Sequence, residues 1–194
     1  MGNRMEPIRD IKKIKDIKNI LKNSHKWRDY LLFVTGLNFG LRIGDLLKIQ
    51  IKNIVDFNYN VEDRFCIIEE KTNKRNIIKI NDEVKNALEL IREKTDLLDN
   101  IENYLIYNTK DKRKSISRVQ AYKLVRKWCN AVGLTDLAVG THTLRKSWGH
   151  HAHKAGISIE VIQAKYLHNS TSTTREYLGI ERKDVSEAYD RVRL

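Results

Sequence analysis

The pattern of hydrophobic and polar positions along the chain predicts a fold built mostly of helices. Apolar residues three and four positions apart mark one face of residues 8–22, and a nearly continuous apolar run covers residues 27–37. The same helical spacing returns after residue 81. We therefore predict helices over residues 8–22, 27–37, 43–48, 82–94, 117–132, 143–155, 158–166 and 184–193.

The middle of the chain changes its period. Residues 51–57, 65–70 and 76–80 are rich in β-branched and aromatic side chains, and polar stretches separate them. Such runs are typical of short strands joined by tight connections. The whole pattern thus predicts an α+β fold that is mostly helical, with a small three-stranded antiparallel sheet.

Length and composition narrow the class of protein. With 194 residues and a hydrophobic fraction of 41%, the chain can bury the core of one domain, with room for a short arm. No apolar run is long enough to span a bilayer, and the N-terminus is too charged for a secretory signal, so we expect no membrane partner. The only two cysteines, Cys66 and Cys129, are too few and too far apart for a disulfide framework.

The charge of the chain points to a polyanionic partner. The formal net charge is +12, and residues 110–127 alone hold eight cations and a single anion. A basic run of this kind can be a solvated helix face, but its concentration here favours a phosphate-binding surface, with nucleic acid as the first candidate. We predict contacts to DNA from residues of this run and of the connection between the second and third predicted strands: Lys74, Arg75, Lys112, Arg113, Lys114, Ser117 and Arg118.

Three short clusters carry candidate chemistry. Arg42 lies in the first, within residues 40–47; His142 and Arg145 form a His-x-x-Arg pair in the second; His168 precedes Tyr177 by nine residues in the third. Alone, each has an ordinary explanation: a surface arginine, a helix brace, a packing tyrosine. Together, in this order and in a basic chain, they suggest a tyrosine nucleophile held among cations, which suits attack on a phosphodiester.

Each group can be given a role in that reaction. A free phenol has a pKa of about 10, so Tyr177 needs nearby positive charge or a base. The two arginines can fork onto non-bridging phosphate oxygens, and the two histidines can donate to the phosphate or accept the tyrosine proton. A lysine on the predicted hairpin can protonate the departing 5′-oxygen; Lys71 is our first choice and Lys74 the second.

Neighbouring residues in the same segments have simpler explanations. Three more histidines follow His142, at positions 150, 151 and 153, but no cysteine or carboxylate stands at ligand spacing beside them. We therefore expect no metal site. Lys146 follows Arg145 directly, and we expect it to be a surface lysine.

The three clusters resemble the motifs of the tyrosine recombinase (phage integrase) family, in particular the catalytic domain of short stand-alone members from low-GC bacteria. Residues 35–47 are similar to the family's first box, and residues 142–147 and 167–177 to its second. Leu167 stands where the family often has glycine, and Gly44 stands where serine is common. The resemblance implies six catalytic residues: Arg42, Lys71, His142, Arg145, His168 and Tyr177.

The resemblance also implies an organisation and an activity. Residues 1–25 would form an N-terminal helical arm, too short for the DNA-clamping domain of larger members, and residues 26–194 the catalytic domain, with a tail helix at 184–193. The implied activity is site-specific recombination or integration through a 3′-phosphotyrosyl intermediate, without metal or other cofactor. The alternatives are DNA relaxation like that of a type IB topoisomerase and a non-catalytic DNA-binding regulator.

The family resemblance implies several partners. The substrate would be double-stranded DNA, and other protomers would assemble with it as a tetramer on two DNA sites, with exchange of the C-terminal tail. Accessory DNA-bending proteins could assist. The expected location is the bacterial cytoplasm, in association with the nucleoid.

Overall fold

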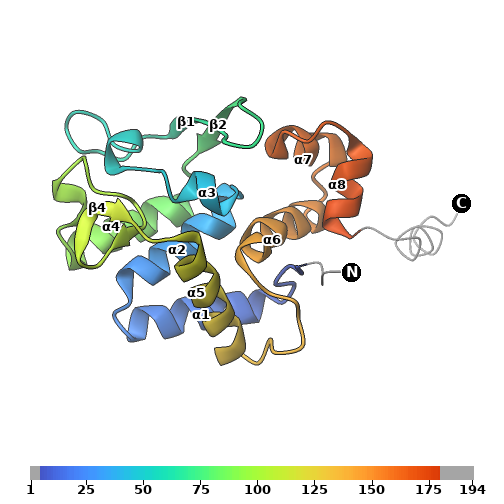
Figure 1. Cartoon of the computed structure of the whole chain (residues 1–194), viewed down its shortest axis with the longest axis horizontal. Coiled ribbons are helices and arrows are strands. Elements are labelled where there is room, and N and C mark those ends of the chain that lie inside the picture. Colours follow the sequence, from blue (N-terminus) through green and yellow to red (C-terminus); the bar gives the residue numbers. More distant parts are fainter. Residues whose placement is uncertain (1–4, 180–194) are drawn as a thin grey trace, which may run out of the picture.

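Helix α2 (Trp27–Phe39) lies at the centre of the fold because it is apolar on nearly every side. In the computed structural model, which describes residues 5–179, α1 (Ile11–Asn23), α4 (Asp82–Lys94) and α6 (Thr141–Lys154) all pack against it. Figure 1 shows this arrangement, with the remaining helices at its edges. The helix ends at Gly40, whose φ of 57° is left-handed and therefore suits glycine.

The seven predicted helices that fall within residues 5–179 are confirmed, each with ends within three residues of the prediction. Four of them begin at a polar side chain that accepts a hydrogen bond from the backbone two or three residues on: Asp10 for α1, Asn81 for α4, Ser117 for α5 (Arg118–Ala131) and Ser158 for α7 (Ile159–Tyr166). The short helix after Arg42 is α3 (Ile43–Leu46). The tail helix predicted at 184–193 lies outside the described residues.

The small sheet differs from the prediction. Strands β1 (Arg64–Ile68) and β2 (Arg75–Lys79) pair antiparallel, with Phe65 opposite Ile78. The predicted first strand, 51–57, is wrong: it begins as a 3-10 turn, η1 (Ile51–Asn53), because side chains of Gln50 and Asn53 close that turn onto its own backbone. Ile51, Ile54 and Val55 of this segment are buried in the core, and its strand pairing is limited to a single antiparallel bridge between Val55 and Val61.

A second hairpin, β3 (Tyr107–Asn108) with β4 (Asp111–Ser115), was not predicted. Its second strand is almost wholly charged, which hides the alternation of a strand. A further turn, η2 (Leu97–Asp99), follows α4.

The segment before α2 shares its core. Ile17 and Leu21 of α1 are buried, as is Ile8, whose N–H donates to Ser147 Oγ of α6 at 2.8 Å. The predicted division between an arm (1–25) and a domain (26–194) stays a prediction. Over residues 5–179, no helix is both long and apolar enough to cross a membrane.

Helices α7 and α8 (Thr171–Leu178) pack on α6 around a separate small cluster of Ile162, Tyr166 and Leu178. They lie together at the right of Figure 1. Helix α8 was not predicted, because its residues 171–176 are all polar and show no apolar stripe. Ser170 starts it by accepting from Thr173 N–H at 3.1 Å, and the helix carries Tyr177 in its last turn.

Candidate active site

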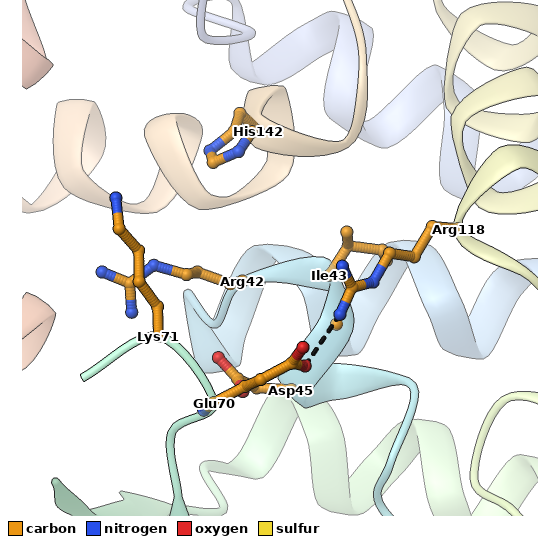
Figure 2. Close-up of a pocket in the computed structure, with 8 residues that line it drawn as sticks. Arg42, Ile43, Asp45, Glu70, Lys71, Arg118 and His142 are labelled. Carbon is orange, nitrogen blue, oxygen red and sulfur yellow. Dashed lines mark hydrogen bonds and ion pairs between the residues drawn. The ribbon is translucent and has the colours of Figure 1, made fainter. Parts of the chain in front are cut away.

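The six predicted catalytic residues come from five parts of the fold and meet at one place. Arg42 immediately precedes α3, Lys71 lies in the connection between β1 and β2, and both line a pocket with His142 of α6 (Figure 2). Helix α6 also carries Arg145. His168, between α7 and α8, has its ring 5.3 Å from that of Tyr177, and His142 Nδ1 is 3.5 Å from the Tyr177 hydroxyl.

A buried carboxylate, Glu69, joins the two arginines. It is fully buried at the end of β1, forms an ion pair with Arg42, and its Oε1 is 4.0 Å from Arg145 Nη1. The same Oε1 accepts a hydrogen bond from Asn76 Nδ2 at 2.7 Å. A buried carboxylate needs such partners, so Glu69 fixes the two guanidinium groups relative to each other.

We did not predict Glu69, although the sequence held a signal for it. In a strand, alternate residues face the same side. Phe65 is buried, Ile67 is half-buried, and Glu69 continues the same alternation inward. A carboxylate on the core-facing side of a predicted strand is a candidate partner for a buried cation.

Arg145 is held by the ends of two helices. Its side chain is 2% exposed, and it donates to the carbonyl oxygens of Gly40 and Tyr166, each at 2.9 Å. Its guanidinium also lies 4.3 Å from the centroid of the Tyr166 ring. Lys165 adds a parallel link, because its Nζ donates to the Phe39 carbonyl at 2.7 Å. The C-terminal end of α2, from which Arg42 follows, is thereby tied to α6 and α7.

Both histidines are kept neutral by their surroundings. Partial desolvation lowers the pKa of His142, and the charges of Arg145 and Arg42 lower it further, although solvent still reaches the ring in the pocket. The same causes lower the pKa of His168 to about 4. A neutral imidazole can accept a proton at physiological pH, so either ring is competent as a base.

His168 is oriented by α8. Its Nδ1 lies 3.0 Å from Thr174 Oγ1, and that hydroxyl donates to the Ser170 carbonyl at 3.3 Å. Because the hydroxyl proton is used there, His168 Nδ1–H is the donor to Thr174, which leaves Nε2 as the acceptor nitrogen.

The ring of Tyr177 is surrounded by fixed groups. The rings of Tyr166 and His168 stand edge-on to it at 5.4 and 5.3 Å, and Lys146 Nζ lies 4.9 Å from its centroid. The expectation that Lys146 is a surface lysine is wrong, because the residue is only 6% exposed. It is buried because it follows Arg145 on a helix that α8 covers. The ammonium group therefore makes a cation–π contact with the Tyr177 ring.

The two departures from the family motifs have local explanations. Leu167 adopts φ 51° and ψ 37° at the end of α7, the left-handed conformation that glycine takes most easily, so the turn is kept at a cost of about 1–2 kcal/mol. At Gly44, a Cβ atom would lie 2.5 Å from Arg118 Nη2. The missing side chain therefore makes room for Arg118.

Among the predicted DNA-contacting residues, Arg118 lines the pocket that holds Arg42, Lys71 and His142. Lys74 and Arg75 are exposed on the hairpin of β1 and β2, while Arg113 is exposed on β4. Lys112 and Lys114 form ion pairs with Asp96 and Asp111, and the Ser117 hydroxyl caps α5. Their contacts to DNA stay predictions. Within residues 5–179, no group of three or more His, Cys, Asp and Glu side chains is placed to hold a metal ion.

Comparison with known proteins shows relatives along almost the whole chain. The sequence profile of the phage integrase family matches residues 9–183. The probable integrase/recombinase YoeC of Bacillus subtilis (strain 168) is 37% identical over 185 residues, which are 95% of each chain.

Solved structures share the fold. The crystal structure of XerA recombinase superposes with a TM-score of 0.74 at 21% identity, over 100% of this chain and 66% of that one. The post-cleavage complex of the XerH site-specific recombinase with its palindromic difH substrate gives 0.72 at 19%, over 97% and 53%. The chain thus spans about half to two thirds of these longer proteins. The family's profile matches 175 residues of this chain, and YoeC is a relative of similar length. The chain therefore belongs to the phage integrase family, the family of the tyrosine recombinases.

Proposed function

We propose that this protein cuts and rejoins double-stranded DNA as a site-specific recombinase, with Tyr177 as the nucleophile. The observation that carries the proposal is the meeting of four groups: the Tyr177 hydroxyl, the neutral His142 at 3.5 Å, and two arginines joined through Glu69. Family membership supports the same activity.

The first step would place the reacting phosphate between Arg42 and Arg145. The charge of a pentavalent phosphorane exceeds that of the ground state, so two fixed guanidinium groups stabilise the transition state more than the bound substrate. Because Glu69 and the backbone carbonyls hold these groups before DNA arrives, little reorganisation is needed during the reaction.

The chemical step would then exchange one phosphoester bond for another. Tyr177 Oη bonds to phosphorus as its proton passes to His142, and the bond from phosphorus to the 5′-oxygen breaks. Lys71, exposed on its hairpin loop, gives that oxygen a proton. The DNA 3′ end remains bound to the enzyme as a phosphotyrosine, and attack by a 5′-hydroxyl of another strand reverses the sequence without an energy source.

Recombination between two sites would need several protomers. XerH in the comparison structure is bound to its difH substrate, and a structure of lambda integrase contains a dimer on a core site. For this chain we propose double-stranded DNA and further copies of itself as partners, acting on the bacterial nucleoid. A tetramer on two sites, tail exchange and accessory bending proteins are the finer parts of this proposal.

A suicide substrate tests the proposal. Duplexes from the DNA that flanks the gene, each with a 5′-bridging phosphorothiolate, should trap a covalent adduct with the wild-type protein and none with Tyr177→Phe, which still binds. Binding without any adduct would favour a non-catalytic regulator. Relaxation of plasmids without site preference would favour a topoisomerase.

A further inference from the structure

The pocket beside Arg42 has a second cationic side. Arg118, at the start of α5, lines this pocket, while Lys48, just after α3, lines the neighbouring one. Both pair with the carboxylate of Glu70, which lies at the edge of the first pocket. Glu70 Oε2 lies 2.7 Å from Arg118 Nη2 and 3.2 Å from Lys48 Nζ. Figure 2 shows Arg118 and Glu70 on one side of the pocket, with Arg42 and Lys71 on the other.

Gly44 places Arg118 at this position. An added Cβ on Gly44 would lie 2.5 Å from Nη2 and 2.9 Å from Cζ of Arg118, closer than such atoms approach. The guanidinium therefore lies directly on the backbone of α3, two residues from Arg42. A larger residue at position 44 would push it away from the pocket.

Glu70 has a fixed backbone and an exposed side chain. Its N–H donates to Oδ1 of the buried Asp45 at 2.9 Å, and its side chain is 47% exposed. Hydrogen bonds and charge from Arg118 and Lys48 lower its pKa, so the carboxylate is ionised at neutral pH. Ion pairs as exposed as these contribute little net stability, so another anion can replace the carboxylate.

We propose that Arg118 and Lys48 form a second phosphate subsite next to the site of the reacting phosphate, and that the Glu70 carboxylate occupies it until a DNA backbone phosphate takes its place. A phosphate presents the guanidinium with the same pair of acceptor oxygens as a carboxylate. Glu70 thus competes with DNA from within the protein. This inference rests on the proposed function, because its ligand is a DNA backbone.

The test measures DNA affinity in the full chain carrying Tyr177→Phe, so that no covalent adduct forms. With a labelled 30-base-pair duplex and fluorescence anisotropy, Glu70→Gln should lower Kd by about threefold to tenfold, the range expected when weak surface pairs no longer compete. Glu102→Gln is the matched control, since Glu102 is similarly exposed and pairs with Lys52. It should leave Kd within about twofold.

A double-mutant cycle separates a masked subsite from general repulsion between Glu70 and DNA. In a protein that also carries Arg118→Gln and Lys48→Gln, Glu70→Gln should change Kd by less than about twofold, because no cation remains to be unmasked. The same gain in both backgrounds would overturn the proposal, as would an unchanged Kd for Glu70→Gln alone.

The two proposals fail in different ways. Suppose that the protein with Tyr177 forms the covalent adduct, but Glu70→Gln changes Kd equally with and without Arg118 and Lys48. That result would overturn the subsite and leave the recombinase function standing. A cycle that behaves as expected, without any adduct, would overturn the function and keep the subsite. Failure of every variant to bind the duplex would overturn both.

Discussion

The two sides of the candidate active site differ in how their charges are held. On the side of α6, α7 and α8, Arg145 and Lys146 are buried, and Arg145 is tied to backbone carbonyls and a buried carboxylate. On the side of α3, α5 and the hairpin loop, Lys71 and Arg118 are exposed, and the ion pair of Arg118 is with the surface carboxylate of Glu70.

This difference separates two tasks within one site. Buried cations cannot leave their partners without a large cost, so the groups around Tyr177 are arranged before substrate arrives. Exposed ion pairs are replaced at little cost, so the opposite side can adapt to DNA. The predictions below test this contrast, from the largest expected effect to the smallest.

Arg145 and Arg118 should differ most in their effect on stability. Arg145→Met frees two buried carbonyl oxygens and removes one of the two cations beside the buried Glu69, so the free energy of unfolding should fall by about 3–5 kcal/mol. Arg118→Met removes only a surface pair and should leave the urea midpoint unchanged. Equal losses for the two variants, measured by urea denaturation, would remove the contrast.

Burial of Lys165 should make the free energy of unfolding depend on pH. Burial lowers its pKa to about 8 from 10.5, so between these values the unfolded chain binds a proton that the folded chain lacks. Stability contributed by this group therefore rises as pH rises through that range, by about 1–3 kcal/mol. Lys165→Met should lack this rise. If wild type and variant show parallel stability curves from pH 7.5 to 10.5, the ammonium is not buried as described.

Lys146 should matter to the reaction of Tyr177. Lys146→Met removes the cation 4.9 Å from the tyrosine ring, so the negative charge that develops on the attacking oxygen is less well stabilised and adduct formation should slow by about tenfold. Lys146→Arg, which keeps the charge, is the control. Equal single-turnover rates for the methionine and arginine variants would show that the charge has no role.

Leu167 should have the smallest effect. Leu167→Gly relieves the left-handed strain but removes a half-buried side chain. Because the two effects oppose each other, the free energy of unfolding should rise by no more than about 0.5 kcal/mol. Leu167→Ala loses the side chain and keeps the strain, so it should be the less stable of the two by about 1 kcal/mol. Thermal melts of both variants measure this difference; an alanine variant as stable as the glycine variant would show that φ at 167 carries no strain.

Much of this fold could be predicted from the sequence, because the apolar spacing and the polar capping residues of helices are visible in it. Helix α4 matched its prediction at both ends, with Asn81 as its cap. Helix α8 was not predicted because it buries only Thr174 and Leu178, and its mostly polar sequence shows no helical spacing of apolar residues. The segment 51–57 misled us because β-branched residues suit a buried turn as well as a strand.

The residues of the candidate site also fall into those that could be predicted from the sequence and those that could not. The order of arginine, histidine and tyrosine motifs predicted the groups that could touch a phosphate. Glu69, Lys146 and Lys165 act on other protein groups, and their roles depend on contacts between residues far apart in the chain. Such contacts follow from packing, which spacing along the sequence does not reveal.

The central claim is that Tyr177 attacks the phosphate and keeps the DNA 3′ end. Trapped complex, digested with trypsin and nuclease and analysed by tandem mass spectrometry, tests this directly. We predict a nucleotide attached through its 3′-phosphate to Tyr177, in the peptide of residues 176–182 that follows Arg175. A nucleotide on any other residue, or one linked through its 5′-phosphate, would contradict the account.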